Sequence, residues 1–250
     1  MTDPQPTEVP RAGLFPVTRW TYVSVLRRDP ESQEGQRALA ELCQAYWYPV
    51  YAFARRKGQS VADAQDLTQG FFAKVLFGGV FSNAQASEGK MRSYLLTAFT
   101  RHMADEWDRS QAKKRGGGLE ILSLDFDDGE ERYLTDIAGA EDIERSFDRA
   151  WALSVLEKAG ASLEEECAKA GKAELFAHLS PLITGSGEAE AYESLAERTG
   201  VNTDSLRQTV RRWRLRFREL LRRVIADTLD EPNDETIDAE LQALRAALTR

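Results

Sequence analysis

The sequence predicts an all-α protein with two small helical domains that are joined by a flexible acidic linker. Among the 250 residues, Ala, Leu, Glu and Arg dominate and runs of Val, Ile and Thr are scarce, which favours helices over strands. Apolar residues recur three or four positions apart over long stretches, the spacing of one helix face. Glycine-rich breaks and changes in charge then divide the helical stretches into two groups.

The formal net charge of −8 conceals two strongly basic segments. Residues 207–223 carry eight Arg against one Glu, and residues 90–115 carry seven Lys or Arg against three acids. Residues 119–147 hold ten acids and two Arg, and residues 227–250 hold seven acids and two Arg. Two basic segments are therefore separated by an acidic linker and followed by an acidic tail.

Composition also argues against several protein classes. No window of about 18 apolar residues exists, so we expect no membrane span, and the polar, Pro-rich start lacks the apolar core of a signal peptide. Cys43 and Cys167 are each alone, so neither a disulfide framework nor a Cys/His metal site is expected. We expect a cytoplasmic protein with no cofactor and no metal.

The breaks in the pattern set the predicted domains and helices. Pro49 should kink or break the first helix, because proline lacks the N–H used in helix interiors, and Gly58 should end it. Ser60 opens the next helix, with Asp63 completing a capping box. The predicted domains are an N-terminal extension 1–35, a helical domain 36–116, an acidic linker 117–147, a second helical domain 148–226 and an acidic tail 227–250. The expected helices are 37–57, one starting at 60, 91–114, 145–169 and 172–183, with a loop at 77–90.

The end of the second domain has the pattern of a helix-turn-helix. A short helix buries Leu195, and Gly200 permits the left-handed turn that a residue with a Cβ resists. Asn202 or Thr203 can cap the second helix, whose first residues are small and polar. Its apolar stripe consists of Leu206, Val210, Trp213, Phe217, Leu220 or Leu221, and Val224. Its arginine flank consists of Arg207, Arg211, Arg214, Arg218 and Arg222.

We interpret this unit as a DNA reader, with the second helix in the major groove and Arg on phosphates and guanines. The alternatives are a solvated basic helix on a bundle and a docking face for an acidic partner. Arginine stripes on amphipathic helices are common, whereas a glycine turn followed by a cap is less so. The order of turn, cap and stripe therefore favours DNA binding.

The basic segment 90–115 interleaves cations with aromatic residues, a pattern that suits single-stranded DNA. The alternative is that the rings belong to the core, which we expect for Phe99 and Trp107, whereas Tyr94 fits either role. His102 lies near acidic residues, but no third ligand or nucleophile is close in sequence. We therefore expect His102 to pack between helices and the protein to catalyse no reaction.

Segment 63–76 resembles region 2 of extracytoplasmic-function (ECF) sigma factors, which belong to the sigma-70 family. The resemblance rests on an acidic-acidic-Leu-Thr-Gln pattern, Asp63-Ala-Gln-Asp66-Leu67-Thr68-Gln69, followed by Phe71, Phe72 and Leu76. The basic-aromatic helix is similar to the part of region 2 that engages the −10 promoter element, and the helix-turn-helix is similar to region 4, which reads the −35 element. The resemblance covers roughly residues 15–115 and 148–225. Residues 15–20 and 111–118 look like an ECF-like subgroup.

This resemblance implies a transcription initiation factor that binds core RNA polymerase and promoter DNA and is a monomer when free, with an anti-sigma factor as a further candidate partner. Loop 77–90 would capture a base flipped from the −10 element. Polymerase binding would fall to Asp63, Asp66, Leu67, Gln69, Phe71 and Phe72. Contacts to the −10 region would come from Arg92, Tyr94, Arg101, Arg109 and Lys113. Contacts to the −35 groove would come from Ser205, Arg207, Gln208, Arg211, Arg212 and Arg214.

The chain departs from the family pattern at several positions, which affects promoter contacts more than architecture. Tyr94-Leu95 replaces a Trp-Leu pair, Arg101 replaces an Asn, and Thr209 falls where an Arg is usual. A longer stretch, 150–183, replaces the short start of region 4. The tail lies outside the pattern, and its leucine spacing predicts one amphipathic helix.

Charge alone suggests that this tail folds back on the arginine helix and lowers DNA affinity until polymerase binds. Two other functions compete with a sigma factor. A stand-alone helix-turn-helix regulator, usually a dimer on two half-sites, leaves the first 115 residues without a role. A helical adaptor that binds no DNA would use both basic segments as protein docking faces.

Overall fold

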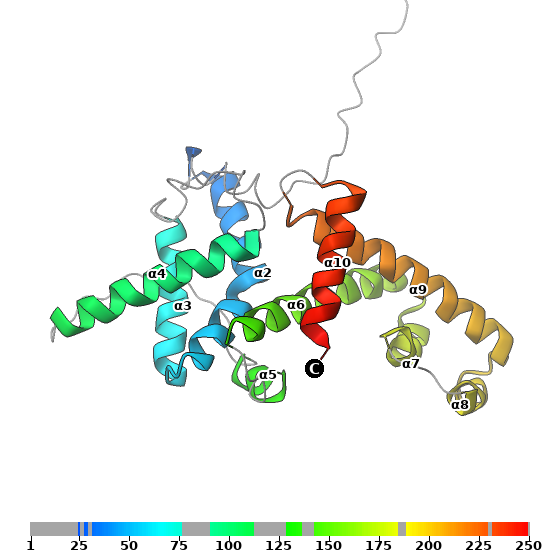
Figure 1. Ribbon diagram of the computed structural model, residues 1–250. Helices are drawn as coiled ribbons and strands as arrows, with labels where there is room; N and C mark the ends of the chain where they lie inside the picture. The colour runs from blue at the N-terminus through cyan, green and yellow to red at the C-terminus, as the bar shows by residue number, and fades with distance from the viewer. Residues whose placement is uncertain are drawn as a thin grey trace, which may run out of the picture.

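The computed structural model describes residues 25, 28, 29, 32–76, 91–112, 129–136, 143–184, 189–229 and 232–249. Within this part of the chain every regular element is an α-helix, which confirms the predicted all-α class (Figure 1). None of these helices is long and apolar enough to cross a bilayer. The helices are α2 (Gln33–Arg56), α3 (Val61–Leu76), α4 (Met91–Ala112), α5 (Gly129–Asp136), α6 (Ile143–Lys169), α7 (Ala173–Thr184), α8 (Ala189–Thr199), α9 (Thr203–Ala226) and α10 (Asp234–Leu248).

Helices α2, α3 and α4 pack around an aromatic centre. Phe71 of α3 contacts Phe99 of α4 edge to face, with ring centroids 5.2 Å apart. Phe53 of α2 lies 6.2 Å from Phe99 and also 6.2 Å from Phe147 of α6. All four rings are buried, and edge-to-face pairs stabilise a core beyond the area that they bury. The apolar faces expected from the sequence therefore meet in one core.

Helix α2 continues through Pro49, so the expected break at this proline is wrong. A proline inside a helix removes one backbone hydrogen bond and crowds the preceding turn. Tyr48, Pro49 and Val50 are all buried, and their packing holds the helical backbone in place. The predicted end of the helix is confirmed, because Gly58 follows the C-cap Lys57 with a φ of +87°.

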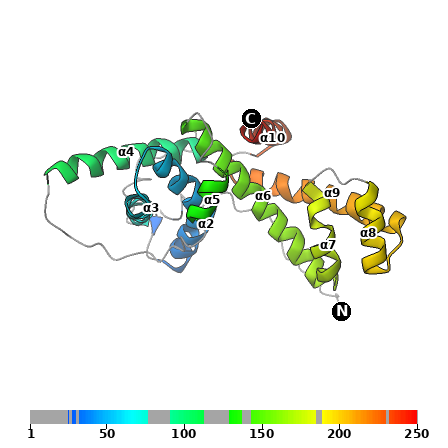
Figure 2. The same ribbon diagram turned by 90° about the horizontal axis from the view of Figure 1, so that it is seen from below.

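Helix α6 is shared by both groups of helices. Its N-terminal part packs against α2, and its C-terminal part packs against α7 and α9. Figure 2 shows it running as one helix from the α2 side of the molecule to α7. The predicted domain boundary between residues 147 and 148 falls inside α6, and the described buried residues form one cluster. No glycine or proline interrupts residues 143–159, so the helix extends into what the charge pattern marked as linker.

Part of the predicted acidic linker is a helix docked on α2. The Glu130 carboxylate of α5 accepts hydrogen bonds from the Tyr51 hydroxyl at 2.6 Å and from Nε of Arg55 at 2.9 Å. The Arg55 guanidinium also lies 5.1 Å from the centroid of the Tyr133 ring, which is buried. Arg132 of α5 adds an ion pair with Glu157 of α6 at 3.0 Å and lies 4.0 Å from the centroid of the Tyr48 ring of α2.

The tail forms the predicted amphipathic helix, α10. Asn233 and Thr236 make a reciprocal capping box at its N-terminus, with Asn233 Oδ1 accepting from the Thr236 N–H at 2.9 Å. Leu244 is buried, and Leu241 and Leu248 are partly buried against the core. Helix α10 packs on α6 and α9, so the tail closes over the junction between the two groups of helices.

Candidate nucleic-acid interface

Helices α8 and α9 and the turn between them form the predicted helix-turn-helix. Gly200 has a φ of +68°, and its N–H donates to the Ala196 carbonyl at 2.9 Å. Asn202 caps α9, because its Oδ1 accepts from the Ser205 N–H at 2.8 Å. Leu206, one position further on, is fully buried. The turn and the cap are therefore set by adjacent residues, as the sequence predicts.

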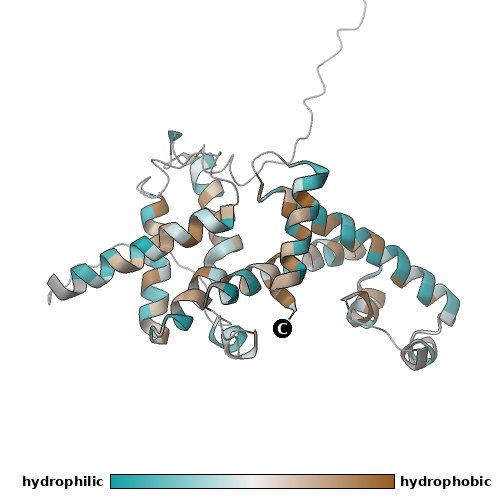
Figure 3. Ribbon diagram, in the orientation of Figure 1, coloured by the Kyte–Doolittle hydropathy of each residue, from teal (hydrophilic) through white to brown (hydrophobic). Residues whose placement is uncertain are grey.

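The apolar stripe of α9 fixes which side of the helix faces solvent. Leu206, Val210 and Trp213 are buried, and the Trp213 ring meets Phe176 of α7 edge to face at 5.6 Å. The side of α9 that faces away from this stripe is strongly hydrophilic (Figure 3). Because the stripe turns inward, the arginines on the remaining surface of α9 form one exposed cationic face.

The N-terminal half of α9 presents all six residues predicted to face the −35 groove. Ser205, Arg207, Gln208, Arg211, Arg212 and Arg214 are exposed. The Arg207 guanidinium lies 5.5 Å from the centroid of the Tyr192 ring of α8, a cation–π contact that orients it.

A shallow groove of about 230 Å³ lies along this flank of α9. Its lining includes Arg218 and Leu215, which the sequence analysis did not assign to a site. Leu215 is 53% exposed, because helix geometry puts it on the side of α9 opposite the buried stripe. Its position one residue after Arg214, between two arginine flanks, was the available indication that it faces outward.

Arg214, the sixth residue, has a structural role. Its Nε and Nη2 donate to the Leu182 carbonyl of α7 at 3.1 Å and 2.7 Å. These bonds satisfy a carbonyl near the C-terminus of α7, where helices leave carbonyls unpaired. Arg214 therefore ties α9 to α7, while the residue remains exposed and lines the same groove as Arg207 and Arg211.

The outer half of α4 projects beyond the α2–α3 bundle (Figure 1). Arg101 and Arg109 are exposed there, and Arg109 pairs with Glu106 at 2.5 Å. Trp107 is 63% exposed, so the expectation that it belongs to the core is wrong. Its neighbours in the sequence are Asp105, Glu106, Asp108 and Arg109, and this charged sequence context was the signal for exposure.

Two inner positions of α4 behave differently. Phe99 is buried, which confirms its expected core role, and Tyr94 is partly buried. Lys113 and the loop 77–90 lie outside the described residues.

Arg92, in the first turn of α4, is 9% exposed. Its guanidinium lies 4.4 Å from the centroid of the Trp151 ring of α6, and its Nε is 3.2 Å from the Asp148 carboxylate. Its Nη1 also pairs with Glu240 of α10. Trp151 and Glu240 are buried, so in this arrangement Arg92 is enclosed and does not present a cation to DNA.

The residues predicted to bind polymerase divide into surface and core. Asp63 and Asp66 are exposed on α3, and Leu67 and Gln69 are partly exposed. Ser60 caps α3, because its hydroxyl accepts from the Asp63 N–H at 3.1 Å and donates to the Asp63 carboxylate at 2.6 Å. Phe71 and Phe72 are buried, at 0% and 1% exposure, so these rings fix α3 in the bundle and lie away from its surface.

His102 lies between α3 and α4, as expected for a packing residue. Its ring centroid is 5.9 Å from that of Phe71 and 6.2 Å from that of Phe99. Burial, with a smaller effect of the Lys74 charge, lowers the pKa of His102 to about 4, so the ring is neutral at pH 7. No group of three His, Cys, Asp or Glu residues that could hold a metal ion occurs in the described part of the chain.

Comparison of the chain with family models, with curated proteins and with solved structures finds no match.

Proposed function

We propose that this protein is a sigma-70-type transcription initiation factor that directs core RNA polymerase to promoters. The observation that carries the proposal is the capped helix-turn-helix, whose second helix exposes Ser205, Arg207, Gln208, Arg211 and Arg212 on one face. Small polar and arginine side chains at the start of a recognition helix are the groups that reach base edges in the major groove. The resemblance to ECF region 4 supports a −35 element as the target.

The exposed arginines divide naturally between bases and phosphates. Those near the N-terminus of α9, Arg207 and Arg211, can bind guanine O6 and N7 with two parallel hydrogen bonds. Arg218 and Arg223 are also exposed, further along the helix, where contacts to phosphates position a protein without reading sequence. Affinity on this face should fall steeply with salt.

Helix α4 supplies a second DNA contact under this proposal. Arg101 and Arg109 are exposed on its projecting half, and Trp107 between them offers an indole ring to solvent. Cations that follow the backbone and rings that stack on unpaired bases are how proteins hold single strands. We assign this half of α4 to the melted −10 region.

The exposed acids of α3, Asp63 and Asp66, with the partly exposed Gln69, are the proposed contact with polymerase. Under this proposal the protein acts by binding and catalyses no reaction itself. It is located in the cytoplasm, where the polymerase acts. We propose that the free protein is a monomer and that an anti-sigma factor is a candidate regulator.

The decisive experiment is run-off transcription with core polymerase on DNA from upstream of the protein's own gene. Discrete transcripts that depend on the protein, and that fall at least tenfold with Arg207→Ala/Arg211→Ala, are expected. Arg37→Ala, an exposed arginine on α2, is the matched control and should transcribe normally.

Binding to core polymerase is measured alongside transcription. A protein that binds DNA but neither binds core polymerase nor supports transcripts is a stand-alone helix-turn-helix regulator. A protein that binds polymerase but shows no salt-dependent DNA binding is an adaptor, and either result removes the sigma assignment.

A further inference from the structure

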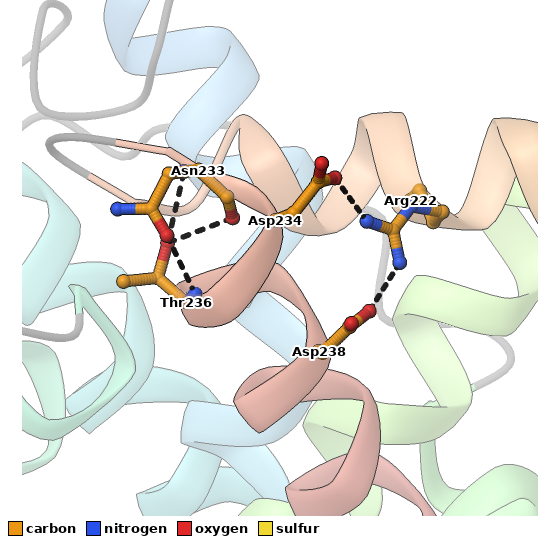
Figure 4. Close-up of polar contacts among 5 residues, drawn as sticks. All are labelled: Arg222, Asn233, Asp234, Thr236 and Asp238. Carbon is orange, nitrogen blue, oxygen red and sulfur yellow. Dashed lines mark hydrogen bonds and ion pairs between the residues drawn. The ribbon is translucent and has the colours of Figure 1, made fainter.

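Helix α10 reaches both helices that carry the proposed DNA-binding arginines. Asp234 accepts a hydrogen bond from Nη2 of Arg222 at 2.6 Å, and Asp238 pairs with Nη1 of the same guanidinium. Figure 4 shows the two carboxylates on either side of Arg222, beside the capping residues Asn233 and Thr236. The capped first turn of α10 is thus fixed directly against the cationic helix α9.

Two residues after Asp238, Glu240 of α10 pairs with Arg92 of α4. Glu240 is 2% exposed and Arg92 is 9% exposed. Residues 92 and 240 are 148 positions apart in sequence, so this pair links the start of α4 to the tail. Together with the Arg222 pairs, it places α10 on arginines from both α4 and α9.

The capping box also accounts for how a short tail holds this position. Asn233 and Thr236 satisfy each other's backbone N–H groups, which preorganises the first turn and its Asp234. On the apolar side, Leu244 is buried, while Ile237, Leu241 and Leu248 are only partly buried. Helix α10 therefore docks through an apolar side with one well-buried residue and through three carboxylates.

We propose that α10 is an autoinhibitory helix whose carboxylates occupy Arg92 and Arg222, so that these cations reach DNA phosphates only when α10 leaves. This inference rests on the proposed function. The ligand that competes with α10 for these arginines is a polyanion such as the DNA backbone. Phosphate oxygens and carboxylates make the same charge-assisted hydrogen bonds to a guanidinium. While docked, α10 also fixes α4 and α9 on α6, and so fixes the distance between the two DNA-binding helices.

The ion pairs between α10 and the arginines can be replaced by contacts to phosphates. Asp234 is 95% exposed and Asp238 is 58% exposed as side chains, and exposed ion pairs contribute little to stability. A buried pair such as Arg92–Glu240 gains little net stability over its desolvation, but it enforces one specific arrangement. Helix α10 is therefore positioned specifically without being held strongly.

The test measures binding of the full-length protein to a fluorescent duplex by anisotropy at several salt concentrations. Asp234→Asn/Asp238→Asn frees Arg222 without disturbing a buried group. One additional phosphate contact, with a slope of about −0.9, should tighten binding about eightfold at about 0.1 M salt and make the log–log salt slope more negative by about 0.9. Glu34→Gln/Glu235→Gln removes the same number of exposed negative charges and controls for net charge.

A second variant loosens α10 without changing any charge. Leu244→Ala removes its most buried apolar side chain and should speed amide exchange in residues 234–248. Arg222 is then released, while Asp148 and Trp151 of α6 still contact Arg92, so the salt slope should become more negative by at least about 0.9. Faster exchange in α10 without tighter DNA binding overturns the proposal.

The outcomes separate this inference from the proposed function. If the wild-type protein binds the duplex with a clear salt dependence and both variants behave like it, autoinhibition is wrong and the DNA-binding function stands. If neither the wild-type protein nor either variant binds duplex DNA, both are wrong.

Discussion

Arg55 of α2 and Glu130 of α5 form a two-point ion pair, with Nε and Nη2 of the guanidinium 2.9 Å and 2.8 Å from the two carboxylate oxygens. The Tyr51 hydroxyl donates a third hydrogen bond to the same carboxylate. Parallel bonds between Arg and a carboxylate are among the stronger charge-assisted contacts. One acidic side chain of the predicted linker therefore makes three of the polar contacts that attach α5 to α2.

Replacing that acid should loosen α5. Glu130→Gln should lower the free energy of unfolding by about 1.5–3 kcal/mol, the range for hydrogen bonds to a charged partner, and should speed amide exchange in residues 129–136. Glu131→Gln, the exposed neighbour in the same helix turn, is the control and should change neither. Equal exchange rates in the two variants would show that α5 is held by other contacts.

Acid should have the same effect on α5. Hydrogen bonds from Arg55 hold the pKa of Glu130 below its usual value. A lowered folded-state pKa means that the stabilisation is fully present above the unfolded value of 4.5 and is lost as pH falls through the folded value. Amide exchange of α5 should therefore stay slow at pH 5 and accelerate only below pH 4.5, after correction for intrinsic exchange, and Glu130→Gln should abolish that acceleration.

His102 should make the protein less stable in mild acid. Its folded-state pKa of about 4 lies below its ordinary value of 6.5, so the unfolded chain takes up the proton first. Stability is then lost as pH falls from about 6.5 towards 4, by about 2 kcal/mol between pH 7 and pH 5. His102→Phe should remove that part of the pH dependence, as measured by urea unfolding at both pH values. A wild-type His102 that titrates near 6.5 by NMR would contradict this.

The cost of placing a side chain at Gly200, in the turn of the helix-turn-helix, should come from backbone conformation alone. Gly200 has a φ of +68°, and a Cβ added there would meet no atom within 4 Å. Gly200→Ala should therefore cost about 1–2 kcal/mol, the penalty for a left-handed residue with a side chain, and Gly200→Asn should cost less. Gly160→Ala, inside α6 and equally open, should instead stabilise the protein by about 0.5–1 kcal/mol. Chemical denaturation of the three variants checks both signs.

Alanine substitutions of the two aromatic residues Phe71 and Trp107 should affect different properties, stability for Phe71 and DNA binding for Trp107. Phe71 is fully buried among other rings, so Phe71→Ala should cost about 3–5 kcal/mol of stability. Trp107→Ala should change stability by less than about 0.5 kcal/mol because the ring is largely exposed. Under the proposed function it should weaken binding to single-stranded DNA by about 1–3 kcal/mol, the value of one stacked base. Unchanged single-strand affinity would remove Trp107 from the proposed −10 contact.

The sequence by itself determined the all-α class, the end of α2 at Gly58, and the turn and cap at Gly200 and Asn202. Each of these depends on a few adjacent residues, because a left-handed φ or an N-cap hydrogen bond is satisfied within one helical turn. The inward stripe of α9 follows from the same short-range periodicity. The proposed functional face of α9 was accessible from sequence for this reason.

Only the tertiary structure decided which charged residues remain available. Arg92 and Arg211 have the same chemistry, yet Arg92 is enclosed by Trp151 and Glu240, whereas Arg211 faces solvent. Trp107 has core-like spacing, but α4 extends beyond the bundle, so spacing does not bury it. In both cases the deciding neighbours come from other helices, and local sequence carries no information about which distant segments will meet.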